Sequence, residues 1–229
     1  MKTILITGAN GSLGSVVTKH FLAKGFRVIA TVRKSEDKKN YQADENLYLE
    51  AIDLTDESRT SSFIQSVLKE YKHIDGALLL VGGFTAGNIA DTSLQDIKEQ
   101  INLNFDTAYN TVRPLFSHML ANNNGRIVFI GSRPALKAAD GKNLIAYSLS
   151  KSLLFKLAEF LNANAKGKNV MVTVVVPSTL DTEINRKSMP KANPDNWVKP
   201  ETLAEIMEFV VSDKASDLRE TVLKVYNNS

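Results

Sequence analysis

Short apolar runs alternate with longer amphipathic stretches along almost the whole chain, and this alternation constrains the fold more than any other feature. The apolar runs resemble strands buried on both faces of a sheet: Ile4–Thr7, Arg27–Val32, Leu47–Ile52, Ala77–Val81, Arg126–Ile130, Val170–Val176 and, more weakly, Val222–Tyr226. The stretches between them have helical spacing: Gly14–Lys24, Asp56–Tyr71, Ser93–Ala121, Ile145–Ala165 and Pro200–Ser212. This order predicts a doubly wound α/β fold, with about seven parallel strands and helices on both faces.

Length and composition narrow the class of protein further. The 229 residues favour one domain, residues 1–229. The formal net charge of +3 is small and dispersed, which argues against a nucleic-acid partner. The chain has no cysteine and only three scattered histidines, so thiol chemistry is excluded and no metal site is expected. No signal peptide or membrane-spanning run is found, so we expect a cytoplasmic protein without a membrane partner.

A glycine-rich turn, G-x-x-G-x-x-G, follows the first predicted strand and leads into the first predicted helix. Glycines at such a junction permit a tight turn and let backbone amides approach a pyrophosphate at the helix N-terminus. An ordinary strand–helix turn is the alternative, but the alternating chain around the motif favours nucleotide binding. We therefore expect a Rossmann fold whose phosphate-binding residues are Gly8, Asn10, Gly11, Ser12, Leu13 and Gly14.

The end of the second predicted strand bears on the choice of nucleotide. A carboxylate there would bind ribose hydroxyls, whereas a basic residue can bind a 2′-phosphate. The chain reads Val32-Arg33-Lys34 and has no acid at this point. The planar guanidinium of Arg33 suits a phosphate because it donates two parallel hydrogen bonds; a solvated loop arginine is the alternative. The sequence favours NADP(H), with NAD(H) as the second choice.

Tyr147 and Lys151 are four residues apart at the start of a predicted helix. Residues at this spacing lie on one helix face, so we expect the phenol and the ammonium group to be neighbours. A neighbouring positive charge favours the phenolate and would lower the tyrosine pKa. The tyrosine could then exchange a proton with a substrate oxygen near neutral pH.

Four motifs in order resemble the short-chain dehydrogenase/reductase family: T-G-x-x-G-x-x-G, Asp53 after the third strand, Ser132 after the fifth, and Tyr147-x-x-x-Lys151. The resemblance covers nearly the whole chain. It implies an oxidoreductase that transfers hydride between a nicotinamide cofactor and a carbonyl or alcohol substrate, a small molecule. It also implies a homodimer or homotetramer formed through the two longest predicted helices.

The resemblance assigns four catalytic roles. Tyr147 would be the general acid/base, and Lys151 would bind the nicotinamide ribose and lower the tyrosine pKa. Ser132 would donate a hydrogen bond to the substrate oxygen. Asn104 matches the helix asparagine that anchors a water for proton relay, with Asn102 as the competing choice.

The resemblance also assigns cofactor contacts beyond the glycine turn. These residues follow the second, third, fourth and sixth predicted strands: Arg33, Asp53, Leu54, Val81, Gly82, Pro177, Leu180 and Thr182. Two departures stand out. The usual N-N-A-G after the fourth strand reads Leu79-Leu80-Val81-Gly82, and Ser178 replaces a glycine of the family pattern.

Two segments, Gly82–Asn88 and Thr179–Trp197, resemble the dihydropteridine reductases more closely. The second overlaps a long loop, about residues 184–199, which we expect to be a substrate lid. Phe84, Met189 and Trp197 would line an apolar substrate wall or pack beneath this loop. Those enzymes prefer NADH and carry an acid after the second strand, where this chain has Arg33. The full set of Ser132, Tyr147, Lys151 and Asn104 instead suits carbonyl chemistry.

The main expectation is therefore an NADP(H)-dependent carbonyl/alcohol oxidoreductase. A quinonoid dihydropteridine reductase that uses NADH is the alternative. A nucleotide-sensing module without catalysis is the remote third, because such proteins often lose the tyrosine or lysine that this chain keeps.

Overall fold

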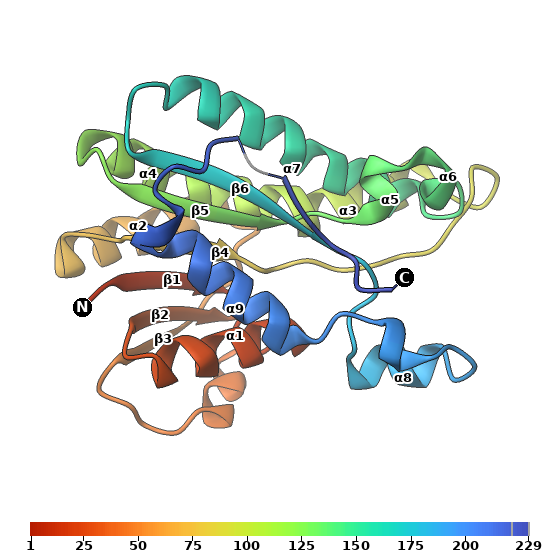
Figure 1. The fold of residues 1–229 in the computed structure, drawn as a ribbon, viewed down its shortest axis with the longest axis horizontal. Coiled ribbons are helices and arrows are strands. Elements are labelled where there is room, and N and C mark those ends of the chain that lie inside the picture. Colours follow the sequence, from red (N-terminus) through yellow and green to blue (C-terminus); the bar gives the residue numbers. More distant parts are fainter. Residues whose placement is uncertain (221, 229) are drawn as a thin grey trace.

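The computed structural model describes residues 1–220 and 222–228. Within these residues, seven parallel strands form one sheet with the order β3-β2-β1-β4-β5-β6-β7 (Figure 1). The strands are β1 (Thr3–Thr7), β2 (Arg27–Val32), β3 (Leu47–Ala51), β4 (Gly76–Leu79), β5 (Gly125–Ile130), β6 (Val170–Pro177) and β7 (Val222–Val225). The predicted fold class is confirmed, and each strand begins and ends within two residues of its apolar run.

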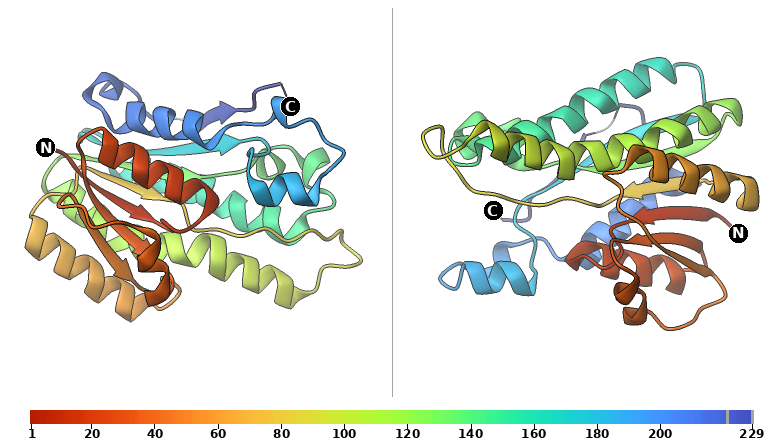
Figure 2. Two further views of the ribbon diagram at one scale, coloured as in Figure 1. Left: turned by 90° about the horizontal axis from the view of Figure 1, so that it is seen from below. Right: turned by 180° about the vertical axis from the view of Figure 1, so that it is seen from behind.

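Helices cover both faces of the sheet (Figures 1 and 2). One face packs against α2 (Glu57–Tyr71), α4 (Thr107–Ala121) and α7 (Ile145–Asn164), and the other against α1 (Ser12–Ala23) and α9 (Pro200–Val211). Alternate residues of β1 face opposite cores: Leu5 lies in the first, and Ile4 and Ile6 lie in the second. Burial of each such side chain contributes roughly 1.5–3 kcal/mol, which is why apolar runs without polar alternation specify this sheet.

The stretch 93–121, expected to be one helix, is divided. Ser93 and Asp96 form a capping box that starts α3 (Leu94–Ile101), and one π-helical turn (Asn102–Asp106) separates α3 from α4. The wider turn leaves a gap in the regular backbone ladder, and such turns are frequent at functional sites. Its position in the fold, beside the carboxyl end of β4, makes it part of the site described below.

The strand order reverses between β1 and β4, so the connections after these two strands run in opposite directions. In doubly wound sheets, ligands bind at the carboxyl ends of the strands at this switch point. The Leu80 amide donates a hydrogen bond to Thr7 Oγ1 (3.0 Å), which ties the end of β4 to β1. The Thr7 side chain on β1 thus forms the link between the two strands that the apolar side chains of Leu79 and Leu80 cannot form.

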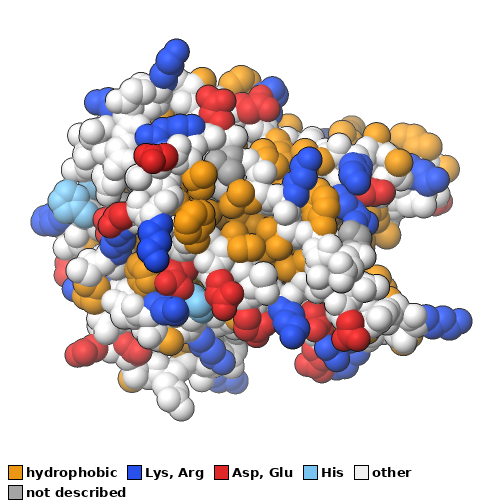
Figure 3. All heavy atoms as spheres, in the orientation of Figure 1, with side chains coloured by type: hydrophobic (Ala, Val, Ile, Leu, Met, Phe, Trp, Pro, Cys, Tyr) orange, Lys and Arg blue, Asp and Glu red, His pale blue; other side chains and the backbone are white. Residues whose placement is uncertain are grey.

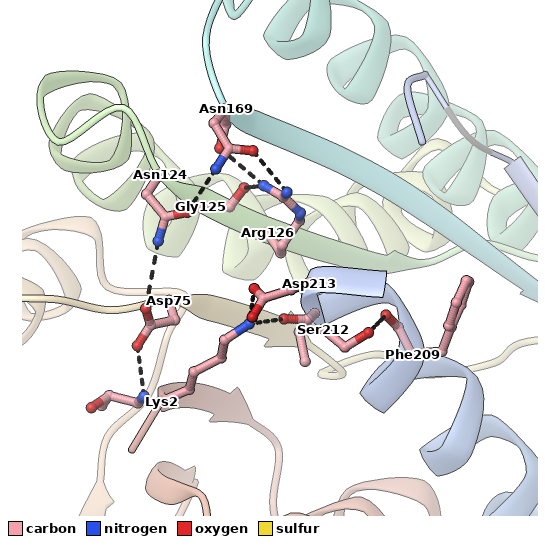
Figure 4. A network of polar contacts seen from close by, with 11 residues as sticks. Lys2, Asp75, Asn124, Gly125, Arg126, Asn169, Phe209, Ser212 and Asp213 are labelled. Atoms are coloured by element: carbon pink, nitrogen blue, oxygen red, sulfur yellow. Dashed lines mark hydrogen bonds and ion pairs between the residues drawn. The ribbon is translucent and has the colours of Figure 1, made fainter. Parts of the chain in front are cut away.

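At the opposite end of the strands, polar side chains form a network that we call the amino-end network (Figure 4). The Arg126 guanidinium donates to the Gly125 and Asn169 carbonyls and to Asn169 Oδ1, at 2.8–3.0 Å. Asp75 Oδ2 accepts from the Thr3 amide (2.8 Å). Lys2 Nζ donates to Asp213 (2.6 Å) and to the last turn of α9. The network joins the starts of β1, β4, β5 and β6 to one another.

The expected lid region contains α8 (Glu183–Ser188) and a 3-10 turn (Pro194–Asn196). Its base is closed by a bridge between Leu180 and Val198. In the space-filling view, the surface is hollowed between α8 and the end of the molecule that carries α5 (Arg133–Leu136) and α6 (Ala138–Gly141) (Figure 3). None of the helices that the structure describes has the length and apolar character needed to cross a membrane.

Candidate active site

A cavity of ≈ 580 Å³ lies at the carboxyl ends of β1, β2 and β4. Eight of the residues expected to bind cofactor line it: Gly8, Asn10, Gly11, Arg33, Asp53, Leu54, Val81 and Gly82. The segments that carry them are far apart in the sequence, and the parallel sheet brings their ends to one edge. The cavity is large enough for a nucleotide-sized ligand.

The glycine turn has the geometry of a phosphate cradle. Gly8 has φ +70°, a conformation that favours glycine. A methyl group in place of the Gly14 hydrogen would lie 2.1 Å from the Gly8 carbonyl oxygen, so only glycine lets α1 pack this closely on the turn. Ser12 begins α1, and no side chain caps the first amides. These amides are suited to an anion, and the residues present fit a dinucleotide pyrophosphate.

Arg33 and Asp53 stand at the far side of the cavity, where Arg33 Nη2 lies 3.5 Å from Asp53 Oδ2. The amide and hydroxyl of Thr55 donate to the other oxygen of Asp53, at 3.1 and 2.8 Å. These hydrogen bonds, and then Arg33, hold the pKa of the Asp53 carboxyl below its ordinary value. Both side chains are exposed, so each is accessible to a ligand.

The three residues expected at the reacting centre come together at the end of β5 and the start of α7. Ser132 is buried, and its Oγ makes no hydrogen bond of ordinary geometry among the described residues. Burial raises the pKa of the Tyr147 phenol above its ordinary value, and the Ser132 hydroxyl beside it offsets part of this rise. The direction is opposite to the lowering expected from Lys151, because removal from water is the largest effect on the phenol.

Lys151 is only 5% exposed, and its Nζ donates to the Ile130 carbonyl oxygen at 2.9 Å. Burial lowers the pKa of this lysine to about 8. Gly82 explains how the ammonium group reaches the end of β4: an added methyl would lie 3.1 Å from Lys151 Nζ and 2.7 Å from Asn104 Oδ1. Glycine at this position therefore leaves room for both polar groups beside the end of β4.

Asn104 is fully buried in the π-helical turn. Its side-chain amide exchanges two hydrogen bonds with the Gly83 backbone, at 3.0 and 3.2 Å. Its Nδ2 also lies 3.1 Å from Gln100 Oε1 and 3.1 Å from Ser150 Oγ. Asn104 is thus the asparagine that adjoins Lys151, while Asn102, its competitor, lines the nucleotide cavity.

The remaining predicted residues lie outside the cavity lining. Leu13 is packed in the core, and Pro177 ends β6. Leu180 takes part in the bridge at the lid base, and Thr182 Oγ1 accepts from the Asn185 amide (3.2 Å) as the N-cap of α8. In this structure, therefore, the Thr182 hydroxyl caps the N-terminus of α8.

The suggested apolar wall needs one correction. Trp197 is buried in the protein and cannot form a substrate wall, whereas Phe84 and Met189 are exposed. Arg133, next to Ser132, forms an ion pair with Asp140 (3.0 Å). The stretch after Ser132 thus folds into α5 and α6, and its Asp140 pairs with its Arg133.

Several site residues were not found from the sequence. Gln100 and Ser150 are buried partners of Asn104, and a search at i, i+4 from Asn104 would have found Gln100. Further cavity residues follow no motif that we used: Thr31, Asp37, Glu99, Leu103 and Thr107. No group of three or more His, Asp or Glu side chains in the described ranges is arranged to hold a metal ion.

This fold and this cavity define a nucleotide-binding α/β protein, and comparison with known proteins places it more closely. A family model described as short chain dehydrogenase matches residues 2–193, and the chain belongs to this family. An uncharacterized oxidoreductase, YvrD of Bacillus subtilis, is 28% identical over 98% of this chain and 94% of its own length. Dihydropteridine reductase of Dictyostelium discoideum is also 28% identical, over 89% of this chain and 85% of its own length.

Solved structures agree on the fold. The structure titled ElxO with NADP bound superposes with a TM-score of 0.91 at 22% identity, and the match covers 98% of this chain and 96% of that one. The chain is thus an oxidoreductase of the short-chain dehydrogenase family with a Rossmann fold.

Proposed function

We propose that the protein is an NADP(H)-dependent oxidoreductase that transfers hydride between the nicotinamide and a carbonyl or alcohol substrate. The observation that carries this proposal is the convergence of Ser132, Tyr147 and Lys151 at the end of β5 and the start of α7, where Ser132 and Lys151 are buried and Tyr147 is half-buried. Lys151 Nζ lies next to Gly82, which lines the nucleotide cavity. A protein that only sensed nucleotides would have no use for a buried lysine on the same helix face as a tyrosine whose phenol adjoins a buried serine hydroxyl.

A bound nicotinamide would supply the hydride, and the protein's own residues would supply position and protons. Ser132 would donate a hydrogen bond to the substrate oxygen, since its hydroxyl has no ordinary partner in the described chain. Tyr147, whose raised pKa keeps the phenol protonated at neutral pH, would give its proton to that oxygen during reduction. Lys151 would hold the ribose of the cofactor from the Ile130 side, and Asn104 would fix the end of β4.

Arg33 supports NADP(H) over NAD(H). Its guanidinium lies exposed at the cavity, and its ionic partner among the described residues, Asp53, is 3.5 Å away, so a 2′-phosphate can displace this weak contact. The neighbour ElxO binds NADP according to its printed title. We further propose that residues 1–229 act as one domain, in which 184–199 covers the substrate, and that the protein works in the cytoplasm as a homodimer or homotetramer.

Parallel titration with NADPH and NADH, followed by turnover with a panel of aldehydes and ketones, tests the proposal. We expect tighter binding of NADPH, and Tyr147→Phe should lower kcat by about 10²–10⁴-fold while leaving the NADPH Kd within about threefold. Tyr48→Phe, which removes the hydroxyl of an exposed tyrosine on β3, is the matched control and should leave kcat unchanged. Full activity in Tyr147→Phe would refute the mechanism.

The second candidate is a quinonoid dihydropteridine reductase, favoured by the Dictyostelium discoideum relative. It predicts a preference for NADH and rapid reduction of quinonoid dihydropterin. Arg33 and the Ser132 hydroxyl weigh against it, because neither has a part in reducing a conjugated imine with NADH. The same titration, with quinonoid dihydropterin added to the substrate panel, distinguishes the two.

A further inference from the structure

Phe84 presents a large apolar ring to solvent next to the proposed proton donor. The side chain is 64% exposed, and its ring packs edge-on against the Tyr147 ring, with the centroids 5.1 Å apart and an interplanar angle of 65°. An exposed aromatic ring is available to a ligand, and covering it removes apolar surface from water, which is favourable. The contact with Tyr147 puts this ring within reach of any substrate whose oxygen meets the phenol.

The residues on both sides of Phe84 are held by buried polar side chains. Gly83 exchanges two hydrogen bonds with Asn104, and Thr85 Oγ1 accepts from Gln100 Nε2 at 3.0 Å. A methyl on Gly83 would lie 2.3 Å from the Leu103 side chain, so Gly83 lies close to the π-helical turn. The exposed ring is therefore attached to a fixed segment.

The far end of the same segment is joined to the start of the catalytic helix. The Gly87 amide donates to the Asn143 carbonyl (2.9 Å), and the Ile145 amide, the first of α7, donates to the Gly87 carbonyl (3.0 Å). Figure 2 shows this segment running from β4 to the end of the molecule that carries α6 and the start of α7. The segment that carries Phe84 is thus joined by hydrogen bonds to the start of the helix that carries Tyr147.

We propose that Phe84 is a substrate-recognition residue that binds a flat, uncharged aromatic group attached to the reacting carbonyl or alcohol carbon. This inference rests on the proposed function, because it places the aromatic group beside the oxygen that Ser132 and Tyr147 would hold. A pre-positioned ring favours an aromatic partner, since aromatic pairs gain stability from ring geometry beyond their buried area and no loop ordering is needed. Charge does not favour an acid, because Arg133 is neutralised by Asp140.

Binding of two alcohols of equal carbon number to the NADPH complex tests the inference without turnover. Benzyl alcohol has a planar ring and cyclohexylmethanol has a saturated one, and neither reacts with reduced cofactor. Their Kd values are measured by ligand-observed NMR titration for the wild-type chain, Phe84→Leu and Phe84→Tyr. The ratio compared is the affinity for benzyl alcohol divided by the affinity for cyclohexylmethanol. We expect this ratio to fall about threefold to tenfold in Phe84→Leu and to keep its wild-type value in Phe84→Tyr.

Ile89→Ala is the matched control, because Ile89 is another exposed apolar residue of the same segment, and it should keep the wild-type ratio. An unchanged ratio in Phe84→Leu, or no detectable binding of benzyl alcohol to the wild-type NADPH complex, would overturn the inference alone. Failure of the wild-type chain to bind NADPH would overturn the proposed function, and this inference with it. Equal NADPH affinity in all variants shows that they are folded.

Discussion

The two ends of the sheet differ in what their buried polar groups bind. At the amino ends of the strands, Arg126 donates three hydrogen bonds, to Asn169 and the Gly125 carbonyl, although its Nε has no partner among the described residues, and Asp75 accepts from the Thr3 amide (Figure 4). At the carboxyl ends, Ser132 Oγ lacks an ordinary partner, and Lys151 is buried at the cost of a lowered pKa. One end contributes stability, whereas the other keeps donors for a ligand and gives up stability to do so.

Ser132→Ala should give the largest effect and separate the two roles most sharply. We expect kcat/KM to fall about 10²–10³-fold, because the substrate oxygen loses a positioned donor. The free energy of unfolding should stay constant or rise by about 1 kcal/mol, since a buried hydroxyl without an ordinary partner is removed. Steady-state kinetics and urea unfolding measure the two effects.

Ser148→Ala is the control for this variant, because Ser148 Oγ is another buried hydroxyl without a hydrogen bond among the described residues. It should raise stability similarly and leave most of the activity. If Ser132→Ala unfolds more easily than the wild type and stays active, the comparison between the two ends is wrong.

Arg126→Met should lower stability without touching catalysis. Loss of three hydrogen bonds from a charged, buried donor should decrease the free energy of unfolding by about 2–3 kcal/mol. The kcat of the folded fraction should be unchanged, because the residue lies at the amino end of β5. Arg113→Ala, which breaks an exposed ion pair with Glu57, should cost less than about 1 kcal/mol. A large fall in kcat with Arg126→Met would contradict the separation of the two ends.

Lys151→Met should abolish activity, because the residue proposed to hold the cofactor ribose is lost. It should also raise the free energy of unfolding at neutral pH by roughly 2 kcal/mol, because ionisation of a buried lysine opposes folding. The pKa falls from 10.5 in the unfolded chain to about 8 in the folded protein. Below pH 8 the lysine is protonated in both the folded and the unfolded chain, so its full destabilising effect on the folded protein is present. As the pH rises toward 10.5 the lysine of the folded protein is already neutral, and this destabilisation disappears.

Urea unfolding of Lys151→Met and wild type at several pH values between 7 and 10.5 measures this advantage. Lys156→Met, on the same helix but exposed and paired with Glu159, should show a difference that does not depend on pH in this range. A stability gain that persisted undiminished at the highest pH would refute the buried-charge explanation.

Arg33→Ser should give the smallest effect, confined to binding. We expect the NADPH Kd to rise about tenfold with the NADH Kd within twofold, because one charge-assisted contact to a 2′-phosphate is lost. Stability should not change, since the exposed Arg33–Asp53 contact contributes little. Lys39→Ser removes a nearby exposed lysine that does not line the cavity and should leave both Kd values unchanged. An equal rise in the Kd of NADPH and of NADH would show that Arg33 does not recognise the 2′-phosphate.

Local patterns predicted most of the scaffold. Strand positions followed from apolar runs because a strand covered on both faces must be apolar throughout, as β6 illustrates. The i, i+4 rule predicted that Tyr147 and Lys151 share a helix face, and glycine spacing predicted the turn before α1. Each of these depends on residues close in the chain, so the sequence is sufficient.

Several features of the site depend on contacts between distant segments. The π-helical turn at Asn104 is held by Gly83 and Ser150, which lie 21 and 46 residues away in the chain. No local pattern predicts it. The burial of Trp197 likewise depends on what packs over the lid base.

By itself, the sequence determined a parallel α/β sheet, a glycine turn for a nucleotide and the residue types of the reacting centre, because these are written in local periodicity and spacing. Only the tertiary structure decided how the reacting centre is tuned. The Tyr147 pKa is raised and not lowered because burial is the largest effect on the phenol, and Phe84 contacts Tyr147 because two buried amide side chains, of Asn104 and Gln100, fix its loop. Desolvation and loop anchoring are collective effects of the packed chain, so spacing along the sequence does not contain them.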